Sequence, residues 1–201
     1  MKIFTKIYDY TINFSRKKDA RRYLYGLSFI ESFIFPIPPD VLLAPMALTR
    51  THGWIQLAFF TTIYSILGGA FGYLIGFYLF EIDILNNIIN EKSFLDAKKL
   101  FNEHGFLIIF LAGFTPLPYK AFTITAGYMS LAIIPFLVAS FFGRGLRFFI
   151  VAAIFYYFGI ERANKIKKYF EYIGYIATIL LIFIFYVKYF NWYANRRQIK
   201  I

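Results

Sequence analysis

The sequence predicts an all-α integral membrane protein with two re-entrant helical hairpins plus transmembrane helices, arranged as an inverted repeat. Three observations support this fold class. Of 201 residues, 59% are hydrophobic and only 16% are charged. Apolar segments long enough to cross a bilayer recur along the chain, and two further apolar segments carry prolines at their centres. A soluble domain of this length could not bury so much apolar surface.

Three continuous segments are long and apolar enough to cross a hydrocarbon core of about 30 Å. They are residues 54–80, 131–158 and 172–190. Lys188 interrupts the last of them, but a lysine near a helix end can extend its ammonium to the interface. The connector over residues 81–104 is polar, and we expect a short interfacial helix over 93–104.

Two other apolar segments, residues 24–48 and 106–128, are interrupted by "FPIPPD" and "TPLPYK". Proline removes a backbone donor and clashes with the preceding turn, so each segment should divide into two half-helices. Each half is too short to cross alone, which predicts hairpins that enter and leave on one side. Non-helical backbone at membrane depth must be covered by protein or line a water-filled cavity. The residues predicted to break the hairpins are Pro36, Pro38, Pro39, Pro116 and Pro118.

The two broken segments match each other, which predicts a duplicated unit of hairpin followed by span. At an offset of 80 the matched residues are Pro36 with Pro116, Pro38 with Pro118, and Asp40 with Lys120. Downstream, residues 67–73 match residues 142–148 at an offset of 75. The chain then forms a single membrane domain with five parts: an amphipathic N-terminal helix (1–23), repeat 1 (24–80), a polar connector (81–104), repeat 2 (105–160) and a C-terminal transmembrane helix and tail (161–201).

The N-terminal part lacks the small-residue cleavage site of a signal peptide. Ile3, Ile7, Tyr10 and Phe14 recur at helical spacing, which favours a helix lying on the membrane surface. The net charge is +11, and the basic residues flank apolar segments, as anchors at anionic headgroups do. We therefore expect membrane lipids and not nucleic acid as partners, and a homodimer stays open.

Catalytic and metal-binding residue types are scarce. The chain has no cysteine and only two histidines, which are far apart in the sequence. Neither a nucleophile–base pair nor a metal-ligand cluster can be recognised. We expect no catalytic residue, no metal and no cofactor, and hence no enzyme; a carboxylate-based lipid hydrolase stays open as an alternative.

The charges inside the apolar segments divide by repeat. Repeat 1 carries Glu31 and Asp40, and repeat 2 carries Lys120, Arg144 and Arg147. A carboxylate in hydrocarbon is costly unless it is paired or hydrated, so acids and bases should meet. The two arginines share a helix face, and forked guanidiniums suit a phosphate. We expect the bases to bind a headgroup and the acids to couple protons or gate movement; structural ion pairs, or Asp40 as a helix N-cap, are the alternatives.

The ordered set of Glu31, "PIPPD", a span, "GFTPLPYKAFTITAG" and "GRGLRF" resembles the DedA membrane-protein family, whose core is called the VTT or "SNARE-associated" domain. The short YqaA-like branch is the most similar, over residues 24–160. The resemblance implies a multi-pass protein of the bacterial inner membrane that translocates lipids between leaflets. Its functional acids and arginines map onto Glu31, Asp40, Arg144 and Arg147. Two positions depart: Gly113 stands where many members have arginine, and Lys120 is the nearest base after the second break.

The function that we expect is that of a lipid translocase, meaning a flippase or scramblase. Its cargo would be phospholipid or polyprenyl phosphate, and proton coupling is one option for its energy source. A transporter of a small anion or solute would use the same charges for a water-soluble ligand. A non-transporting membrane scaffold would use them only as structural ion pairs.

Overall fold

The computed structural model describes residues 19–49, 53–81 and 91–159, together with the single residues 14, 17 and 179. This part of the chain is all-helical, which confirms the α-helical part of the prediction. The predicted N-terminal amphipathic helix and the span over 172–190 lie outside the described residues.

The first broken segment consists of α2 (Ala20–Glu31) and α3 (Asp40–Leu48), separated by the non-helical residues 32–39, called here the first break. A residue that precedes proline is pushed away from helical geometry, and three prolines crowd this stretch. Pro39 takes the N-cap position of α3 with φ −64°, so its ring already holds the dihedral that the helix needs. Asp40 is therefore the first residue of α3, and the alternative in which it is the N-cap of this helix is wrong.

The second broken segment consists of α5 (Glu91–Phe114) and α6 (Tyr119–Tyr128), separated by residues 115–118, the second break. Pro118 takes the N-cap position of α6, as Pro39 does for α3. The separate interfacial helix expected over residues 93–104 is wrong, because these residues form the first turns of α5. No proline falls between Glu91 and Phe114, so nothing obliges the helix to stop where its sequence changes from polar to apolar.

Within the described ranges, two helices are long and apolar enough to cross a membrane, by length and composition: α4 (Trp54–Glu81) and the helix Ile133–Gly159. They agree with the predicted spans over 54–80 and 131–158. One side of α4 exposes large apolar side chains, including Ile55, Leu67 and Tyr78. Such a face is suited to contact with lipid tails.

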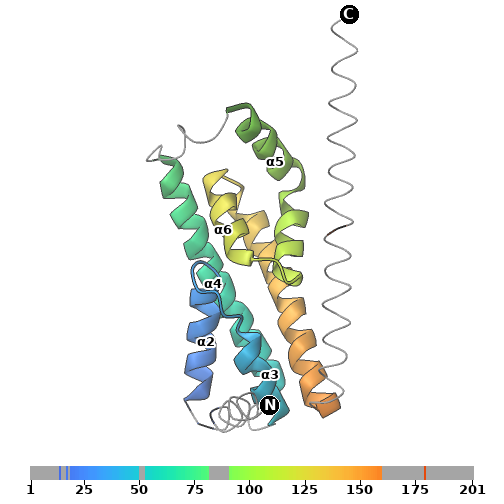
Figure 1. The fold of residues 1–201 in the computed structure, drawn as a ribbon. Helices are drawn as coiled ribbons and strands as arrows, with labels where there is room; N and C mark the ends of the chain where they lie inside the picture. Colours follow the sequence, from blue (N-terminus) through green and yellow to red (C-terminus); the bar gives the residue numbers. More distant parts are fainter. Residues whose placement is uncertain are drawn as a thin grey trace, which may run out of the picture.

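Figure 1 shows that the two hairpins approach from opposite ends of the helix bundle. The start of α2 and the end of α3 lie at the lower end, whereas the start of α5 and the end of α6 lie at the upper end. Both breaks therefore fall near mid-height. The long helix α4 packs against α2, α3 and α6.

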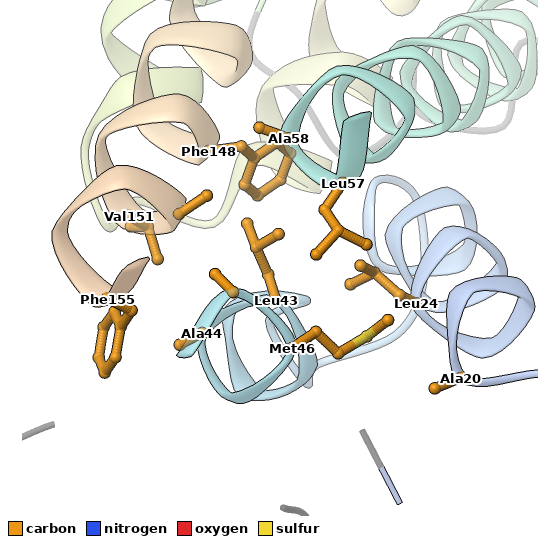
Figure 2. Close-up of a cluster of buried hydrophobic side chains, with 12 residues drawn as sticks. Ala20, Leu24, Leu43, Ala44, Met46, Leu57, Ala58, Phe148, Val151 and Phe155 are labelled. Atoms are coloured by element: carbon orange, nitrogen blue, oxygen red, sulfur yellow. The ribbon is translucent and has the colours of Figure 1, made fainter. Parts of the chain in front are cut away.

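Two apolar clusters hold these elements together. In the first, Leu24 of α2, Leu43 of α3 and Leu57 of α4 point toward one another, and Phe148 of the helix Ile133–Gly159 closes the group (Figure 2). The second cluster joins α4, α5, α6 and the other half of the helix Ile133–Gly159, and its fully buried members include Ile109, Tyr119, Ala126 and Phe136.

Glycines allow close helix contacts in two corresponding places. A Cβ on Gly68 of α4 would overlap the carbonyl oxygen of Phe29 in α2, and a Cβ on Gly143 would overlap the carbonyl oxygen of Phe110 in α5. The sequence repeat aligns these two glycines. In each half, then, the first arm of the hairpin packs against a glycine of the long helix that follows it.

Candidate functional site

An ion pair joins Asp40 of the first hairpin to Arg147 of the helix Ile133–Gly159. The Nη2 atom of Arg147 lies 2.6 Å from Oδ2 of Asp40. The Nη1 atom of the same guanidinium donates to the carbonyl oxygen of Thr115, in the second break, at 2.9 Å. Asp40 is buried in the first turn of α3, where the helix dipole favours a carboxylate. One arginine thus contacts both hairpins at once.

A second ion pair joins Glu31, the last residue of α2, to Arg144. The Nη2 atom of Arg144 donates to Oε2 of Glu31, and Nε donates to the hydroxyl of Ser65 in α4 at 2.6 Å. The Arg144 side chain is only 2% exposed, whereas that of Arg147 is 16% exposed. The interior therefore encloses Arg144 much more completely than Arg147.

Aromatic rings complete the surroundings of Arg144. Its guanidinium carbon lies 4.9 Å from the ring centre of Tyr119 and 4.6 Å from that of Phe148. Both distances suit a cation–π interaction. The hydroxyl of Tyr119 donates to Ser140 at 2.6 Å, which fixes its ring. Because Phe148 belongs to the first apolar cluster and Tyr119 to the second, Arg144 lies where the two clusters meet.

Lys120 lies in the first turn of α6, and its ammonium donates to the carbonyl oxygen of Ile34, in the first break, at 3.2 Å. The repeat alignment matches Lys120 with Asp40, but the structure pairs Asp40 with Arg147. The helices that follow the two breaks begin at Asp40 and Tyr119, so their register differs by one residue from the proline alignment. Lys120 is thus one position further along its helix than Asp40 is along α3.

Hydroxyl groups supply further contacts between the two hairpins and between the first hairpin and α4. Thr123 of α6 donates to the carbonyl oxygen of Ser32 at 3.1 Å, and the hydroxyls of Ser32 and Ser65 lie 2.8 Å apart. Ser65 was not among the residues predicted from the sequence. Its spacing from Thr61, four residues earlier in an otherwise apolar helix, is the signal that would have identified it.

The predicted break prolines all lie in or beside the breaks. Pro36 and Pro38 are exposed in the first break and Pro116 is half-buried in the second, while Pro39 and Pro118 are the two N-caps. Among the described residues, no group of three or more His, Asp or Glu side chains could hold a metal ion.

The five predicted site residues therefore gather around the two breaks. Both acids come from the first hairpin, and all three bases come from α6 or the helix Ile133–Gly159. Each of these bases binds a residue of the first hairpin. Chemically, the arrangement supplies two guanidiniums and an ammonium that an anion could engage, with two carboxylates as its internal competitors.

Comparisons with known proteins identify a family and two relatives. A family model described as the VTT domain matches residues 37–157. An uncharacterized protein of Haemophilus influenzae is 41% identical over 175 residues, covering 85% of this chain and 90% of its own length. An uncharacterized protein of Histophilus somni is 38% identical, covering 85% of this chain and 91% of its own length. No solved structure matches.

Proposed function

The chain belongs to the VTT-domain family of membrane proteins, and from this premise we propose that it moves phosphate-bearing lipids between the leaflets of the bacterial inner membrane. The cargo class is phospholipid or polyprenyl phosphate. The membrane lipids are then both the solvent of the protein and its substrate.

The proposal includes the topology. The two hairpins are re-entrant and belong to inverted repeats, and α4 and the helix Ile133–Gly159 cross the bilayer between them. Their opposed entry in Figure 1 and the corresponding glycine contacts of Gly68 and Gly143 support this arrangement. Non-helical backbone can be placed at membrane depth because the opposite hairpin supplies partners for it, as Lys120 does for the carbonyl of Ile34.

One observation carries the function: two ion pairs, Glu31 with Arg144 and Asp40 with Arg147, join the first hairpin to the helix Ile133–Gly159 beside the breaks. A phosphate is a forked acceptor like a carboxylate, so it can replace a carboxylate on a guanidinium. In this proposal the acids occupy the bases in the absence of cargo, and a headgroup displaces an acid while its chains remain in the bilayer.

Proton coupling follows from the same exchange. A carboxylate displaced from its arginine is left charged in a poorly hydrated interior, which is costly. Taking up a proton removes that charge, and releasing the proton restores the ion pair. In this scheme a proton gradient would drive the cycle, and without one the protein would act as a scramblase.

The experiment is reconstitution of the full chain into phosphatidylcholine vesicles that contain fluorescent phosphatidic acid or undecaprenyl phosphate. Leaflet exchange is measured by quenching from outside, with and without a proton gradient, against protein-free vesicles. Exchange of the phosphate lipid but not of a neutral glycolipid probe supports the proposal. Flux of inorganic phosphate without lipid exchange would favour the anion transporter instead, and absence of both would favour the scaffold.

A further inference from the structure

The three bases of the site differ in what holds their donors. Arg144 gives its donors to a carboxylate and a buried hydroxyl, and two aromatic rings cover it. Lys120 donates to a neutral backbone carbonyl. Arg147 donates to the carbonyl oxygen of Thr115 and to the carboxylate of Asp40. The cost of transferring each base to a new acceptor therefore differs.

The two carbonyls concerned lie in the breaks. Ile34 is in the first break and Thr115 in the second, where the prolines interrupt the helical ladder that would otherwise occupy such oxygens. A neutral carbonyl is a weaker acceptor for a cation than an anionic phosphate, because only the phosphate adds the attraction between two opposite charges. Exchange of a break carbonyl for a phosphate oxygen is therefore favourable at Lys120 and at one arm of Arg147.

We infer that Lys120 and Arg147 together receive the phosphate, and that Arg144 is a positioning residue that holds the two halves together. This inference rests on the proposed function. An ammonium has three donors, and among the described residues Lys120 uses one of them, so two remain for a ligand. Arg144 has no comparable freedom, because exchange there would break the contacts that join both apolar clusters.

The same geometry connects binding to movement. Lys120 reaches from the second hairpin to the first break, and Arg147 reaches from the helix Ile133–Gly159 to the second break. A phosphate that takes these donors releases one carbonyl in each break. Headgroup binding therefore loosens both hairpin tips, while the Glu31–Arg144 pair keeps the rest of the bundle in place.

The test uses the full chain in detergent and measures the binding of dihexanoyl phosphatidic acid by the shift in unfolding temperature. Lys120→Gln and Arg147→Lys should each raise the apparent Kd about tenfold, because each removes a charge-assisted contact but leaves no unpaired buried carboxylate. Lys99→Gln is the matched control: Lys99 lies on α5 with its side chain 70% exposed, and its variant should bind like the parent. Parental binding by both Lys120→Gln and Arg147→Lys would overturn the inference.

Arg144 is replaced together with its partner Glu31, so that neither charge is left buried without the other. The double variant Glu31→Gln with Arg144→Gln should unfold at a lower temperature, and what remains folded should bind dihexanoyl phosphatidic acid within a few-fold of the parent. A double variant that unfolds like the parent but binds no phosphatidic acid would make Arg144 a ligand residue and overturn its positioning role. If the double variant yields no folded protein, the positioning role of Arg144 is supported. The Kd values of Lys120→Gln and Arg147→Lys then decide whether these two residues receive the phosphate.

Further arms separate this inference from the proposed function. A parent that binds dihexanoyl phosphatidic acid but exchanges no lipid in vesicles would end the translocase proposal and leave the phosphate site standing. If the parent exchanges lipid and the Lys120→Gln and Arg147→Lys variants exchange it equally well, the translocase proposal stands and the assignment of the phosphate site to these two residues is overturned. Stabilisation by inorganic phosphate alone would support these same bases with free phosphate as their ligand. A parent that responds to neither probe overturns both proposals.

Discussion

Arg147 binds Asp40 at 2.6 Å, although the two residues are 107 positions apart in the sequence. The contact joins the first turn of α3 to the middle of the helix Ile133–Gly159. Because Arg147 also binds the carbonyl of Thr115, one side chain connects the two breaks through a carboxylate and a carbonyl. The site is therefore built from contacts between the halves of the chain, and its energetics can be tested pair by pair.

Removing one member of this pair should destabilise the protein more than removing both. Asp40→Asn leaves Arg147 without its anion, and stranding one partner of a buried pair costs roughly 3–5 kcal/mol in the free energy of unfolding. Adding Arg147→Gln should recover a substantial part of that loss. The measurement is the unfolding free energy of parent, single and double variants in one detergent.

The control for this cycle is Lys120→Gln in the Asp40→Asn background. Lys120 binds the Ile34 carbonyl and not Asp40, so its removal should give no recovery. Recovery by Lys120→Gln but not by Arg147→Gln would contradict the observed pairing.

The sequence predicted the acids and bases of this site but not how they pair. Prolines and charges in apolar segments are local signals, and they located both breaks and all five charged residues. The pairing depends on how the helices pack, since Arg147, which binds Asp40, lies on the helix Ile133–Gly159, whereas Lys120 lies on α6. The first break spans residues 32–39 and the second only residues 115–118, and no sequence alignment of two short breaks fixes that difference.

Ser65→Ala should lower stability more than Ser28→Ala. The Ser65 hydroxyl accepts from the Nε atom of Arg144, whereas Ser28 donates to the neutral carbonyl of Thr61 at 2.8 Å. Hydrogen bonds that involve a charged group contribute about 1.5–3 kcal/mol, against about 1 kcal/mol for neutral ones. Both serines are fully buried, so a difference in exposure does not confound the comparison.

Unfolding free energies of the two serine variants, measured against the parent, provide the check. Adding Arg144→Gln should remove most of the Ser65→Ala effect, because the charged donor is then absent. Equal losses for Ser28→Ala and Ser65→Ala would show that the Arg144 contact adds nothing to stability.

Gly76→Ala should destabilise the protein, whereas Gly26→Ala should be close to neutral. A Cβ on Gly76 would overlap the carbonyl oxygen of Ile124 in α6, so α4 and α6 would have to separate. Overpacking of this kind costs about 1–3 kcal/mol. Gly26 lies in α2 with no atom within 4 Å of its Cβ position, and alanine is the better helix former there.

Melting temperatures of the two alanine variants test this contrast within one protein. A Gly76→Ala protein as stable as the parent would mean that α4 and α6 do not approach as closely as described. The glycines could be recognised in the sequence as packing residues of an apolar span, but their contacts could not, because the identity of the neighbouring helix depends on the tertiary fold.

The hairpin topology predicts which sites a membrane-impermeant thiol reagent can reach from each side. The chain has no native cysteine, so single cysteines can be introduced without background labelling. Arg22→Cys near the start of α2 and Thr49→Cys just after α3 should label from one side of the membrane. Leu95→Cys on α5 and Ser130→Cys just after α6 should label from the other side, because the second hairpin enters from the opposite end (Figure 1).

Labelling in intact cells and in inverted membrane vesicles makes the test independent of which end faces the cytoplasm, since it asks only for agreement within each pair and opposite sides for the two pairs. Ala112→Cys is the control, because its side chain is buried within the second apolar cluster and should resist the reagent from both sides. Opposite sidedness for Arg22 and Thr49 would mean that the first hairpin crosses the bilayer. The Asp40–Arg147 pair would then have to form within a full span, and the exchange of carboxylate for headgroup at a re-entrant tip would lose its structural basis.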